Sequence, residues 1–354
     1  MRNYKNFICY ILDIKENTLD NVLTKSKYHT FKVPKRSGGY RKISAPDDRL
    51  KWVQEKLNNY ITKKYEFLEC QYGFVKGKSI VDNAKVHNKA KYILNIDLKD
   101  FFPSIHFGRV RGIFMSEPFN LPNYVATTLS KIACYHNELP QGSPCSPTIS
   151  NIVCYSLDKQ LLNLSKKYDF NYSRYADDIT LSSNKPFPKE IVTRTQENYV
   201  IIGNKLRSII EKQGFTINEK KTNYSWNNER KEVTGLIVNE KVNIKKVYLK
   251  QLRALLNRCE KDGLYRTALY YFKKEKNYNC NGYKRDKLIL EIRKVIEGRL
   301  NFVAMVRGNK DLVYQRYLKQ YLDILHQENI YSVNIKKKIF DDGFYDDVYD
   351  EEYY

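Results

Sequence analysis

Two adjacent aspartates, Asp177 and Asp178, are the residues of this chain best suited to chemistry. Apolar and β-branched residues flank them over residues 172–182 and predict a strand, a tight turn and a second strand. Two carboxylates at a hairpin tip repel each other, and a bound divalent cation would remove that repulsion. Mg²⁺ prefers one or two carboxylates together with substrate phosphates, so the pair suits metal-dependent phosphoryl transfer. An ordinary solvated turn is the alternative, because Asp is common in turns.

A third aspartate far upstream, Asp97, strengthens the catalytic interpretation. It follows the apolar run Tyr92-Ile93-Leu94-Asn95-Ile96, which predicts a buried strand. A charge at the end of a buried strand is unfavourable unless it is paired or bound to a metal. Two strand-borne carboxylate positions that converge in the fold would therefore be able to hold two metal ions.

The composition points to a nucleic-acid partner. The chain has 354 residues, enough for two or three structural units, and a formal net charge of +22. An excess of Lys and Arg along most of the length is typical of proteins that bind a phosphate backbone. The 30 Tyr and 16 Phe residues interleave with these cations and suit base stacking. An AT-rich genome would also raise the Lys and Tyr counts, but it explains the excess of Lys over Glu less well.

The cysteines and the hydropathy pattern predict a cytoplasmic protein with no membrane partner. Seven Cys are scattered without a C-x-x-C pair, which fits a reducing compartment. No run of 18 apolar residues is present, and the first 13 residues lack the apolar core of a signal peptide.

The elements that must position the carboxylates follow from the local patterns. Residues 31–46 predict a hairpin with basic residues on both arms, because a Ser-Gly-Gly turn separates two β-prone runs. The spacing of Pro and Gly over residues 139–147 predicts a rigid turn before a helix that continues to about residue 164. Further helices are predicted over residues 1–30, 48–69, 121–136 and 190–213, the Asp97 strand over 93–105, a short β-turn-β unit over 233–239, and a basic helical region over 245–335.

Taken in order, these motifs resemble those of reverse transcriptases, and specifically the bacterial retron-type enzymes. The resemblance covers residues from about 31 to 320. It rests on the basic hairpin ending Ile43-Ser44-Ala45-Pro46 and on the segments 97–102, 139–151, 175–178, 214–222 and 233–235. Asn83-Ala84-Lys85-Val86-His87 and Val233-Thr234-Gly235 are similar to elements of the retron branch. The segment 143–147 departs slightly from the family pattern, which often has Ala or Thr there.

The resemblance implies an α+β fold, a right-hand polymerase with fingers, a palm built on an antiparallel sheet, and a helical thumb. Residues 1–92 would form an N-terminal region and fingers, and 93–240 the palm, with a finger segment at about 106–136. Residues 241–335 would form the thumb. Residues 336–354 would be a flexible tail whose last fourteen residues hold seven acidic residues and four Tyr. That tail would either dock a partner or stay disordered, or its charges would compete with nucleic acid.

For the chemistry, the resemblance implies that Asp97, Asp177 and Asp178 bind two Mg²⁺ ions, with the main-chain carbonyl of Leu98 as a further ligand. Asp178 would be a weaker ligand or would orient the site, because successive strand residues point to opposite faces. An ordinary turn aspartate is the alternative. Lys221 matches the lysine that protonates pyrophosphate. Its neighbour Lys220 is a rival that the sequence does not separate from it.

The nucleotide-binding residues are also carried by the resemblance. Arg41 matches the arginine that grips the incoming triphosphate, with Lys35 or Arg36 beside it, and a solvated basic hairpin is the alternative. Gln141 and Gly142 match the turn that faces the nucleotide, where Gly allows close approach of the backbone.

Phe102 matches the aromatic residue that blocks a ribose 2′-hydroxyl and so selects deoxynucleotides. A core phenylalanine is the alternative, and Phe101 is the more suitable core member of the pair.

RNA contacts are expected elsewhere in the chain. His87 and Asn83 belong to the retron element and are candidates for binding the cognate RNA, although His87 would equally suit a bonded structural role. Arg253, Arg258 and Arg266 lie in the basic helical region. They would contact the template–primer backbone or form a solvated helix face.

The function predicted from these features is RNA-directed DNA synthesis from deoxynucleoside triphosphates. In the retron type, the template is a structured non-coding RNA, a 2′-hydroxyl of that RNA primes synthesis, and a separate effector protein takes part in antiphage defence. Two alternatives stay open: another defence-associated reverse transcriptase that makes repetitive or untemplated DNA, and a non-catalytic RNA-binding scaffold.

Overall fold

The computed structural model describes residues 2–34, 38–197, 199–275, 282 and 284–330. The chain divides into two units, one ending at Thr234 and the other beginning at Gly235. Each unit has its own secondary structure and is described separately. The predicted tail at residues 336–354 lies outside the described residues.

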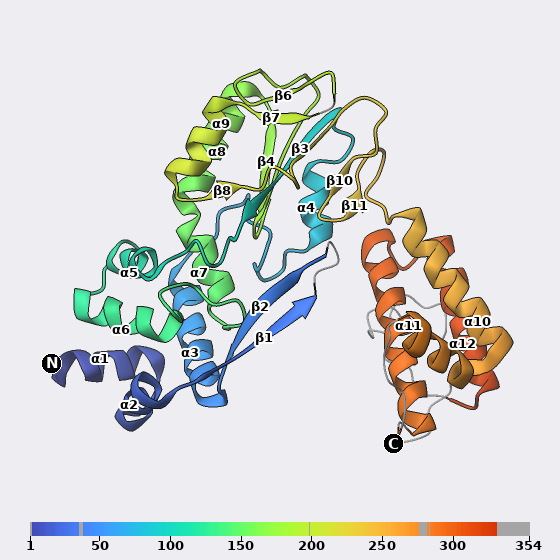
Figure 1. Cartoon of the computed structure of the whole chain (residues 1–354), viewed down its shortest axis with the longest axis horizontal. Coiled ribbons are helices and arrows are strands. Elements are labelled where there is room, and N and C mark those ends of the chain that lie inside the picture. The colour runs from blue at the N-terminus through green and yellow to red at the C-terminus, as the bar shows by residue number, and fades with distance from the viewer. Residues whose placement is uncertain (1, 35–37, 198, 276–281, 283, 331–354) are drawn as a thin grey trace. The chain divides into compact units, whose positions relative to one another are not determined.

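The first unit begins with helices and a long hairpin. The elements are α1 (Arg2–Leu12), α2 (Glu16–Lys25), β1 (Tyr28–Pro34), β2 (Tyr40–Pro46) and α3 (Asp48–Lys64). Strands β1 and β2 pair antiparallel along their whole length, as the sequence predicted for this basic hairpin (Figure 1). Asp47 caps the N-terminus of α3, because its side chain accepts a hydrogen bond from the Leu50 amide at 2.9 Å.

A five-stranded antiparallel sheet forms the middle of this unit, and β3 (Tyr92–Lys99) is its central strand. One edge of β3 pairs with β5 (Asp178–Ser183), which in turn pairs with β4 (Asn171–Tyr175). The other edge of β3 pairs with β8 (Thr216–Ile217) and β9 (Asn223–Ser225). The mixed helices and antiparallel sheet agree with the predicted α+β class.

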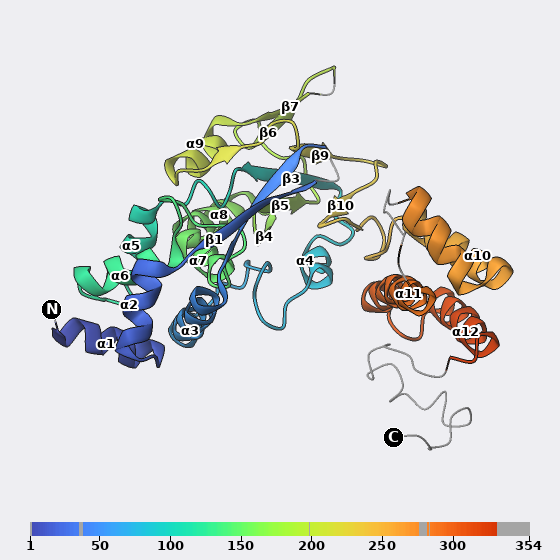
Figure 2. The ribbon, with the colours of Figure 1, turned by 60° about the horizontal axis from the view of Figure 1, so that its bottom comes forward.

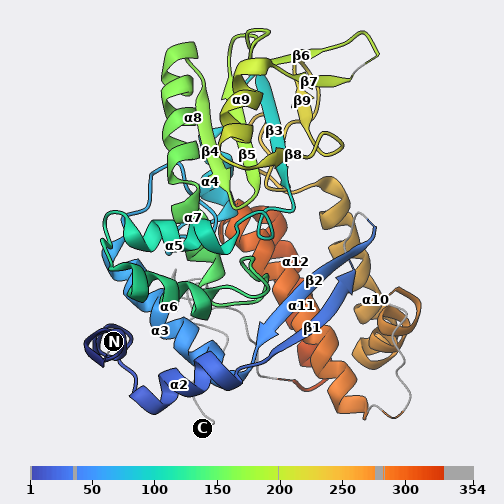
Figure 3. The ribbon, with the colours of Figure 1, turned by 60° about the vertical axis from the view of Figure 1, so that its left-hand side comes forward.

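Helices cover the sheet, and Figures 1 and 3 show α8 and α9 beside it. The alternation of side chains along β4 explains why two elements pack there. Tyr172 and Arg174 reach Asp158 on α8, whereas Ser173 points to the opposite face and bonds His87 at the end of α4. The helices of this part are α4 (Ile80–Val86), α5 (Phe107–Met115), α6 (Asn123–Ala133), α7 (Ser146–Val153), α8 (Tyr155–Tyr168) and α9 (Asn204–Lys212).

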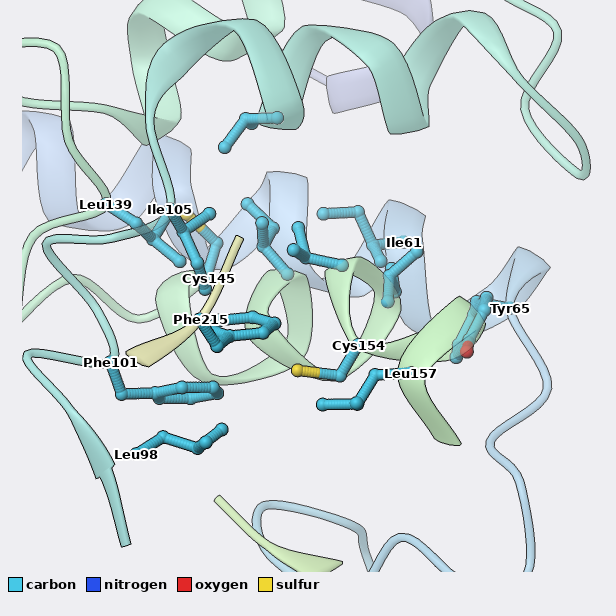
Figure 4. Close-up of a cluster of buried hydrophobic side chains, with 14 of the residues drawn as sticks. Ile61, Tyr65, Leu98, Phe101, Ile105, Leu139, Cys145, Cys154, Leu157 and Phe215 are labelled. Carbon is cyan, nitrogen blue, oxygen red and sulfur yellow. The ribbon is translucent and has the colours of Figure 1, made fainter. Parts of the chain in front are cut away.

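The main hydrophobic core lies directly behind the end of β3. Figure 4 shows Leu98, Phe101 and Phe215 lying together in this core. The rings of Phe101 and Phe215 stack with centroids 5.5 Å apart. Phe101 is therefore the core member of the Phe101-Phe102 pair, as predicted. Anchoring the strand end in the core fixes the position of the neighbouring Asp97.

The prediction of one helix over residues 190–213 is wrong. The segment contains two short antiparallel strands, β6 (Val192–Arg194) and β7 (Val200–Ile202), before α9 begins. Their β-branched residues favour strands over helix. Gly203 then permits a close approach to the Glu190 backbone that a Cβ atom would block.

Four other predicted helices have the right type but different ends. The helix predicted over residues 1–30 is divided into α1 and α2 and ends at Lys25. The helix predicted over 48–69 ends at Lys64, and that over 121–136 is α6. The helix predicted to run on to residue 164 is divided at Cys154 into α7 and α8 and continues to Tyr168. The first unit closes with β10 (Glu232–Val233).

The second unit is helical after β11 (Leu236–Ile237). Its helices are α10 (Lys246–Tyr270), the π-helical turn η1 (Tyr271–Glu275), α11 (Arg285–Arg307) and α12 (Leu312–Gln327), and Figure 2 shows α11 and α12 side by side. Gly263 breaks α10 with a φ of 76°, and the following Leu264 amide donates to Glu328 at 2.9 Å. No helix among the described residues has the length and apolar character needed to cross a membrane.

Candidate active site

The structure brings together the three aspartates that the sequence selected. Asp97 on β3 is the direct register partner of Asp178 on β5. The amide of Leu98 donates to the carbonyl oxygen of Asp177 at 3.0 Å, so the turn of the β4–β5 hairpin adjoins the end of β3. Antiparallel pairing thus places carboxylates from distant parts of the chain at the adjoining ends of β3 and β5.

The electrostatic environment at these strand ends favours binding of a proton or a cation to the carboxylates. Burial, and then the negative charge of Asp97, raises the pKa of Asp177, although Lys221 and Arg41 oppose the shift. The pKa of Asp178 is raised to about 7 by loss of solvation, then by Asp177 and Asp97. Solvent still reaches Asp178, so water screens part of this repulsion. The carboxylates together carry more negative charge than their protein neighbours neutralise.

Asp97 is held by two donors from the segment after α9. Its Oδ1 accepts from Asn218 Nδ2 at 2.7 Å, and its Oδ2 accepts from Lys221 Nζ at 2.8 Å. The Asn218 amide also donates to the Asp97 carbonyl at 2.8 Å. Of the two rival lysines, Lys221 makes this contact with Asp97, and its role as the acid for pyrophosphate stays a prediction. The hydrogen bond to Asp97 is the main cause that raises the pKa of Lys221 and keeps it protonated.

The donor set fits a hard divalent cation, although no complete cage is present. Clustered carboxylate oxygens are the ligands that Mg²⁺ prefers, and a cation would relieve the repulsion that raises the pKa values of Asp177 and Asp178. Among the described residues, no three His, Cys, Asp or Glu side chains stand in a ready metal-binding arrangement. Mg²⁺ usually completes its octahedron with water and substrate phosphates, so such a partial set is what a nucleotide-dependent site needs. The side chain of Leu98 is buried in the core, which leaves only its main chain for the predicted ligand role.

Behind the turn lies a buried polar cluster, which we call the Arg174 network: Gln71, Asn151, Asp158, Tyr172 and Arg174. Arg174 and Asp158 are fully buried and form a bidentate ion pair, with Nε–Oδ1 at 2.8 Å and Nη2–Oδ2 at 2.7 Å. Tyr172 Oη donates to Asp158 Oδ1 at 2.5 Å, and Gln71 Nε2 donates to Oδ2 at 2.7 Å. Asp158 thus accepts four hydrogen bonds, which satisfies a buried carboxylate.

The Arg174 network also holds the backbone next to Asp177. Arg174 Nη1 donates to the Ala176 carbonyl at 3.0 Å and to Asn151 Oδ1 at 3.1 Å. Ala176 has a φ of 57°, a left-handed conformation that is uncommon for a residue with a Cβ atom. Packing from the other side is tight, because a Cβ atom on Gly73 would lie 2.5 Å from the Ala176 nitrogen. The network therefore over-determines the position of the residue before Asp177.

The basic hairpin docks on the predicted nucleotide-facing turn. The Ser44 amide donates to the Gln141 carbonyl at 2.8 Å, and a Cβ atom on Gly142 would lie 2.6 Å from the Ser44 oxygen. Gly142 also has a φ of 134°, which favours glycine. Arg41 is exposed on β2, and its positive charge opposes the rise in the pKa of Asp177. The predicted contact through Lys35 lies outside the described residues.

Phe102 borders the same site. It is half-buried, and its ring lies 5.4 Å from the ring of Phe101 and 6.3 Å from that of Phe74. Phe102 thus lies between the core ring of Phe101 and the exposed ring of Phe74, and its predicted contact with the sugar stays a prediction.

His87 and Asn83 are buried in the first unit. Ser182 Oγ lies 2.7 Å from His87 Nδ1, and Ser173 Oγ lies 2.7 Å from Nε2. Burial lowers the pKa of His87 to about 3, so the ring is neutral and ties α4 to the β4–β5 hairpin. These bonds favour the structural alternative for His87 over direct RNA contact. The Asn83 amide is also enclosed, and its side-chain atoms make no hydrogen bond within the described part of the chain.

The three predicted RNA-binding arginines, Arg253, Arg258 and Arg266, lie on α10 of the second unit. Arg253 is exposed, and it lines a polar hollow with Asn257 and Glu260. Arg258 is half-buried, with its guanidinium 3.6 Å from the centre of the Tyr270 ring. Arg253 and Arg266 are both exposed and are therefore more accessible for a phosphate contact than Arg258.

Sequence reasoning missed Asn218 and the Arg174 network. Asn218 lies inside the motif 214–222, but its type alone gave no role. Arg174 carried a usable signal, since a charged residue at a buried strand position requires a partner. Its partner Asp158 lies on a helix and had no local signal.

Comparisons with known proteins show the family to which the chain belongs. The sequence profile described as "Reverse transcriptase (RNA-dependent DNA polymerase)" matches residues 33–239. The Retron Mx65 reverse transcriptase of Myxococcus xanthus is 34% identical over 248 residues, covering 65% of this chain and 55% of the relative. The Retron Ec86 reverse transcriptase of Escherichia coli is 36% identical over 234 residues, covering 65% of this chain and 69% of the relative.

A solved structure of Candida albicans telomerase with an RNA fragment covers 87% of this chain and 65% of its own. Its TM-score of 0.44 and identity of 13% are too low to define the fold. The chain spans little more than half the length of the Mx65 enzyme. The match to more than half of the chain and the identity to the Ec86 enzyme define the class: the chain belongs to the reverse transcriptase family and, within it, to the bacterial retron type.

Proposed function

We propose that this chain is an RNA-directed DNA polymerase of the retron type. Its active site lies at the adjoining ends of β3 and β5. The observation that carries the proposal is the register pairing of Asp97 with Asp178, with Asp177 joined to Leu98 through the backbone. In this proposal, residues 1–92 form the N-terminal region and fingers, 93–240 the palm, and 241–335 the thumb.

Asp97 and Asp177 would hold two Mg²⁺ ions, with Asp178 and the Leu98 carbonyl as weaker contributors. When bound, these ions supply stabilisation of the charge on the attacking and leaving oxygens of the phosphoryl group. The raised pKa values of Asp177 and Asp178 support this assignment, because a cation lowers the energy of clustered carboxylates.

Lys221 and Arg41 act on the triphosphate. Lys221 Nζ is protonated beside Asp97 and donates a proton to the departing pyrophosphate. Arg41 binds phosphate oxygens with the planar fork of its guanidinium. The docking of the basic hairpin on the Gln141 turn supports a role for both segments around one nucleotide.

Phe102 and Gln141 select and orient the nucleotide. The ring of Phe102 would occupy the space that a ribose 2′-hydroxyl needs, so that deoxynucleotides are preferred. Gln141 would contact the sugar or base, and Gly142 would let the backbone approach.

The retron type further implies a cognate structured non-coding RNA, priming from its 2′-hydroxyl, and a role in antiphage defence with a separate effector protein. The net charge of +22 supports binding of a polyanion. The exposed Arg253 is the candidate for a backbone contact, with Arg258 as a second.

Primer extension tests the polymerase proposal. Purified protein is given an RNA template with an annealed DNA primer, deoxynucleotides and Mg²⁺. We expect extension by the wild type and none by Asp177→Ala. Equal incorporation by both proteins would exclude the assigned site, and no extension by either would favour the scaffold alternative.

Sequencing the DNA that copurifies with the protein tests the retron proposal. A discrete copy of one structured RNA, joined to that RNA, is the expected result. Long homopolymeric or repetitive DNA would instead identify another defence-associated reverse transcriptase.

A further inference from the structure

Phe74 is an exposed aromatic residue beside the active site to which the proposed function gives no role. Its exposed fraction is 45%, although phenylalanine usually packs in a core. Its φ is 63°, in the left-handed region that bulky residues rarely adopt. A large ring held at the surface in an unfavourable backbone conformation indicates a function at this position.

The backbone before Phe74 is locked to the turn that carries Asp177. Gly73 lies against the Ala176 nitrogen, and its carbonyl accepts from Asn151 Nδ2 at 2.8 Å. Asn151 in turn is bonded by Arg174, which also bonds the Ala176 carbonyl. The Arg174 network therefore fixes both the segment that leads into Phe74 and the segment that leads into Asp177.

Phe74 is the outermost ring of a row that starts in the core. Phe215 stacks on Phe101, Phe101 meets Phe102 edge to face, and Phe102 lies 6.3 Å from Phe74 with a tilt of 53°. Exposure rises along the row: Phe215 and Phe101 are buried, Phe102 is half-buried and Phe74 is exposed. The row thus supports Phe74 from behind and leaves part of its surface to solvent next to the residue assigned to the sugar.

We propose that Phe74 stacks on a nucleobase of the template–primer at the active site. This inference rests on the proposed function and adds a binding residue to it. A templated polymerase must accept all four bases at each position, so this contact has to be tolerant of sequence. Stacking on an aromatic face meets that requirement, because every base has a π-face, whereas a hydrogen-bonding side chain would distinguish between bases.

The test measures single-nucleotide incorporation by the wild type, Phe74→Ala and Phe74→Tyr. Stacking contributions at such sites predict that Phe74→Ala lowers kcat/KM by about 5- to 140-fold, whereas Phe74→Tyr retains near wild-type activity. Tyr124→Ala is the matched control, because Tyr124 is 46% exposed on α6 and has no assigned role. We expect Tyr124→Ala to leave kcat/KM unchanged.

Substrates that lack one base identify the stacking partner. If Phe74 stacks on the templating base, the wild type and Phe74→Ala become equal on a template with an abasic site there. If it stacks on the primer-terminal base, they become equal on a primer that ends in an abasic site. Either result supports the inference and separates its two sources.

Other results would overturn it. A deficit of Phe74→Ala that persists unchanged on both abasic substrates would mean that the ring only supports Phe102, and ribonucleotide incorporation would then rise. Phe74→Leu, which keeps an apolar side chain, replaces Phe74→Ala if the latter unfolds at a lower temperature. If the wild type is active and Phe74→Ala is equally active, this inference alone is overturned. If the wild type is inactive, the proposed function is overturned as well.

Discussion

The β4–β5 hairpin has charged residues on two sides of its turn, and they are neutralised to different degrees. In front of the turn, Asp97, Asp177 and Asp178 gather at an open edge, with Lys221 as the directly bonded cation. Behind the turn, Asp158 is fully buried, accepts four hydrogen bonds and pairs bidentately with Arg174. The front keeps unneutralised negative charge, whereas the back is closed.

The difference separates two uses of charge in one structure. A buried pair with every hydrogen bond satisfied adds specificity of position, and removing one partner is expensive. An open cluster with raised pKa values is less stable but is ready to bind a cation. Because Arg174 bonds Ala176, directly before Asp177, the closed side sets the geometry of the open side.

The largest expected effect is on activity, from a change in front of the turn. Asp177→Asn keeps the shape of the side chain but removes a metal-binding charge, so we expect the rate of incorporation to fall by at least about 10³-fold. The free energy of unfolding at pH 7.5 without Mg²⁺ should stay the same or increase, because repulsion with Asp97 is lost. A variant that keeps activity within tenfold, or that unfolds much more easily, would contradict the division between front and back.

A change behind the turn should act mainly on stability. Asp158→Asn leaves the Arg174 guanidinium buried without its carboxylate, which costs about 3–5 kcal/mol in urea unfolding. The double change Arg174→Met with Asp158→Leu should recover part of that stability, since it removes both charges but leaves Tyr172 Oη and Gln71 Nε2 without this acceptor.

The exposed pair of Lys185 with Asp169, 3.3 Å apart, provides the control for Asp158→Asn. Lys185→Met should change the free energy of unfolding by less than about 0.5 kcal/mol. Losses of similar size at the buried and exposed pairs would show that the Arg174 network has no special role.

Lys221 tests whether the cation in front of the turn has a chemical role. We expect Lys221→Gln to slow incorporation about 10²-fold by removing a general acid. Lys220→Gln should have little effect, because Lys221 is the one of the two lysines that bonds Asp97. Equal losses in single-turnover measurements would show that the two lysines contribute only general positive charge.

His87, which bonds Ser173 on the face of β4 opposite the Arg174 network, provides the smallest predicted loss and is tested by pH. Its folded pKa of about 3 lies below the ordinary value of 6.5, so the unfolded chain binds a proton that the folded chain does not between these pH values. Stability is therefore fully present above pH 6.5 and decreases as the pH falls, by about 2 kcal/mol at pH 5. Unfolding of His87→Gln should depend less on pH between 7.5 and 5 than unfolding of the wild type. Parallel pH profiles for the two proteins would contradict the buried neutral imidazole.

The parts of the site that the sequence predicted are those with local patterns. The carboxylates follow strand patterns, and the hairpin and turn follow glycine and proline spacing. The Arg174 network was not predicted, because its members come from four segments that meet only in the fold. The helix wrongly expected over residues 190–213 shows the same limit, since β-branched residues on both sides of a turn decided the outcome.

The most direct test of this account is a titration of protein stability with Mg²⁺ at constant ionic strength. Thermal unfolding of the wild type and Asp177→Asn is followed as MgCl₂ replaces KCl. A cation that binds only the folded carboxylate cluster raises the unfolding temperature of the wild type and leaves that of the variant unchanged. An equal rise in the unfolding temperature of both proteins, or no rise in that of the wild type, would contradict a cation site at the adjoining ends of β3 and β5.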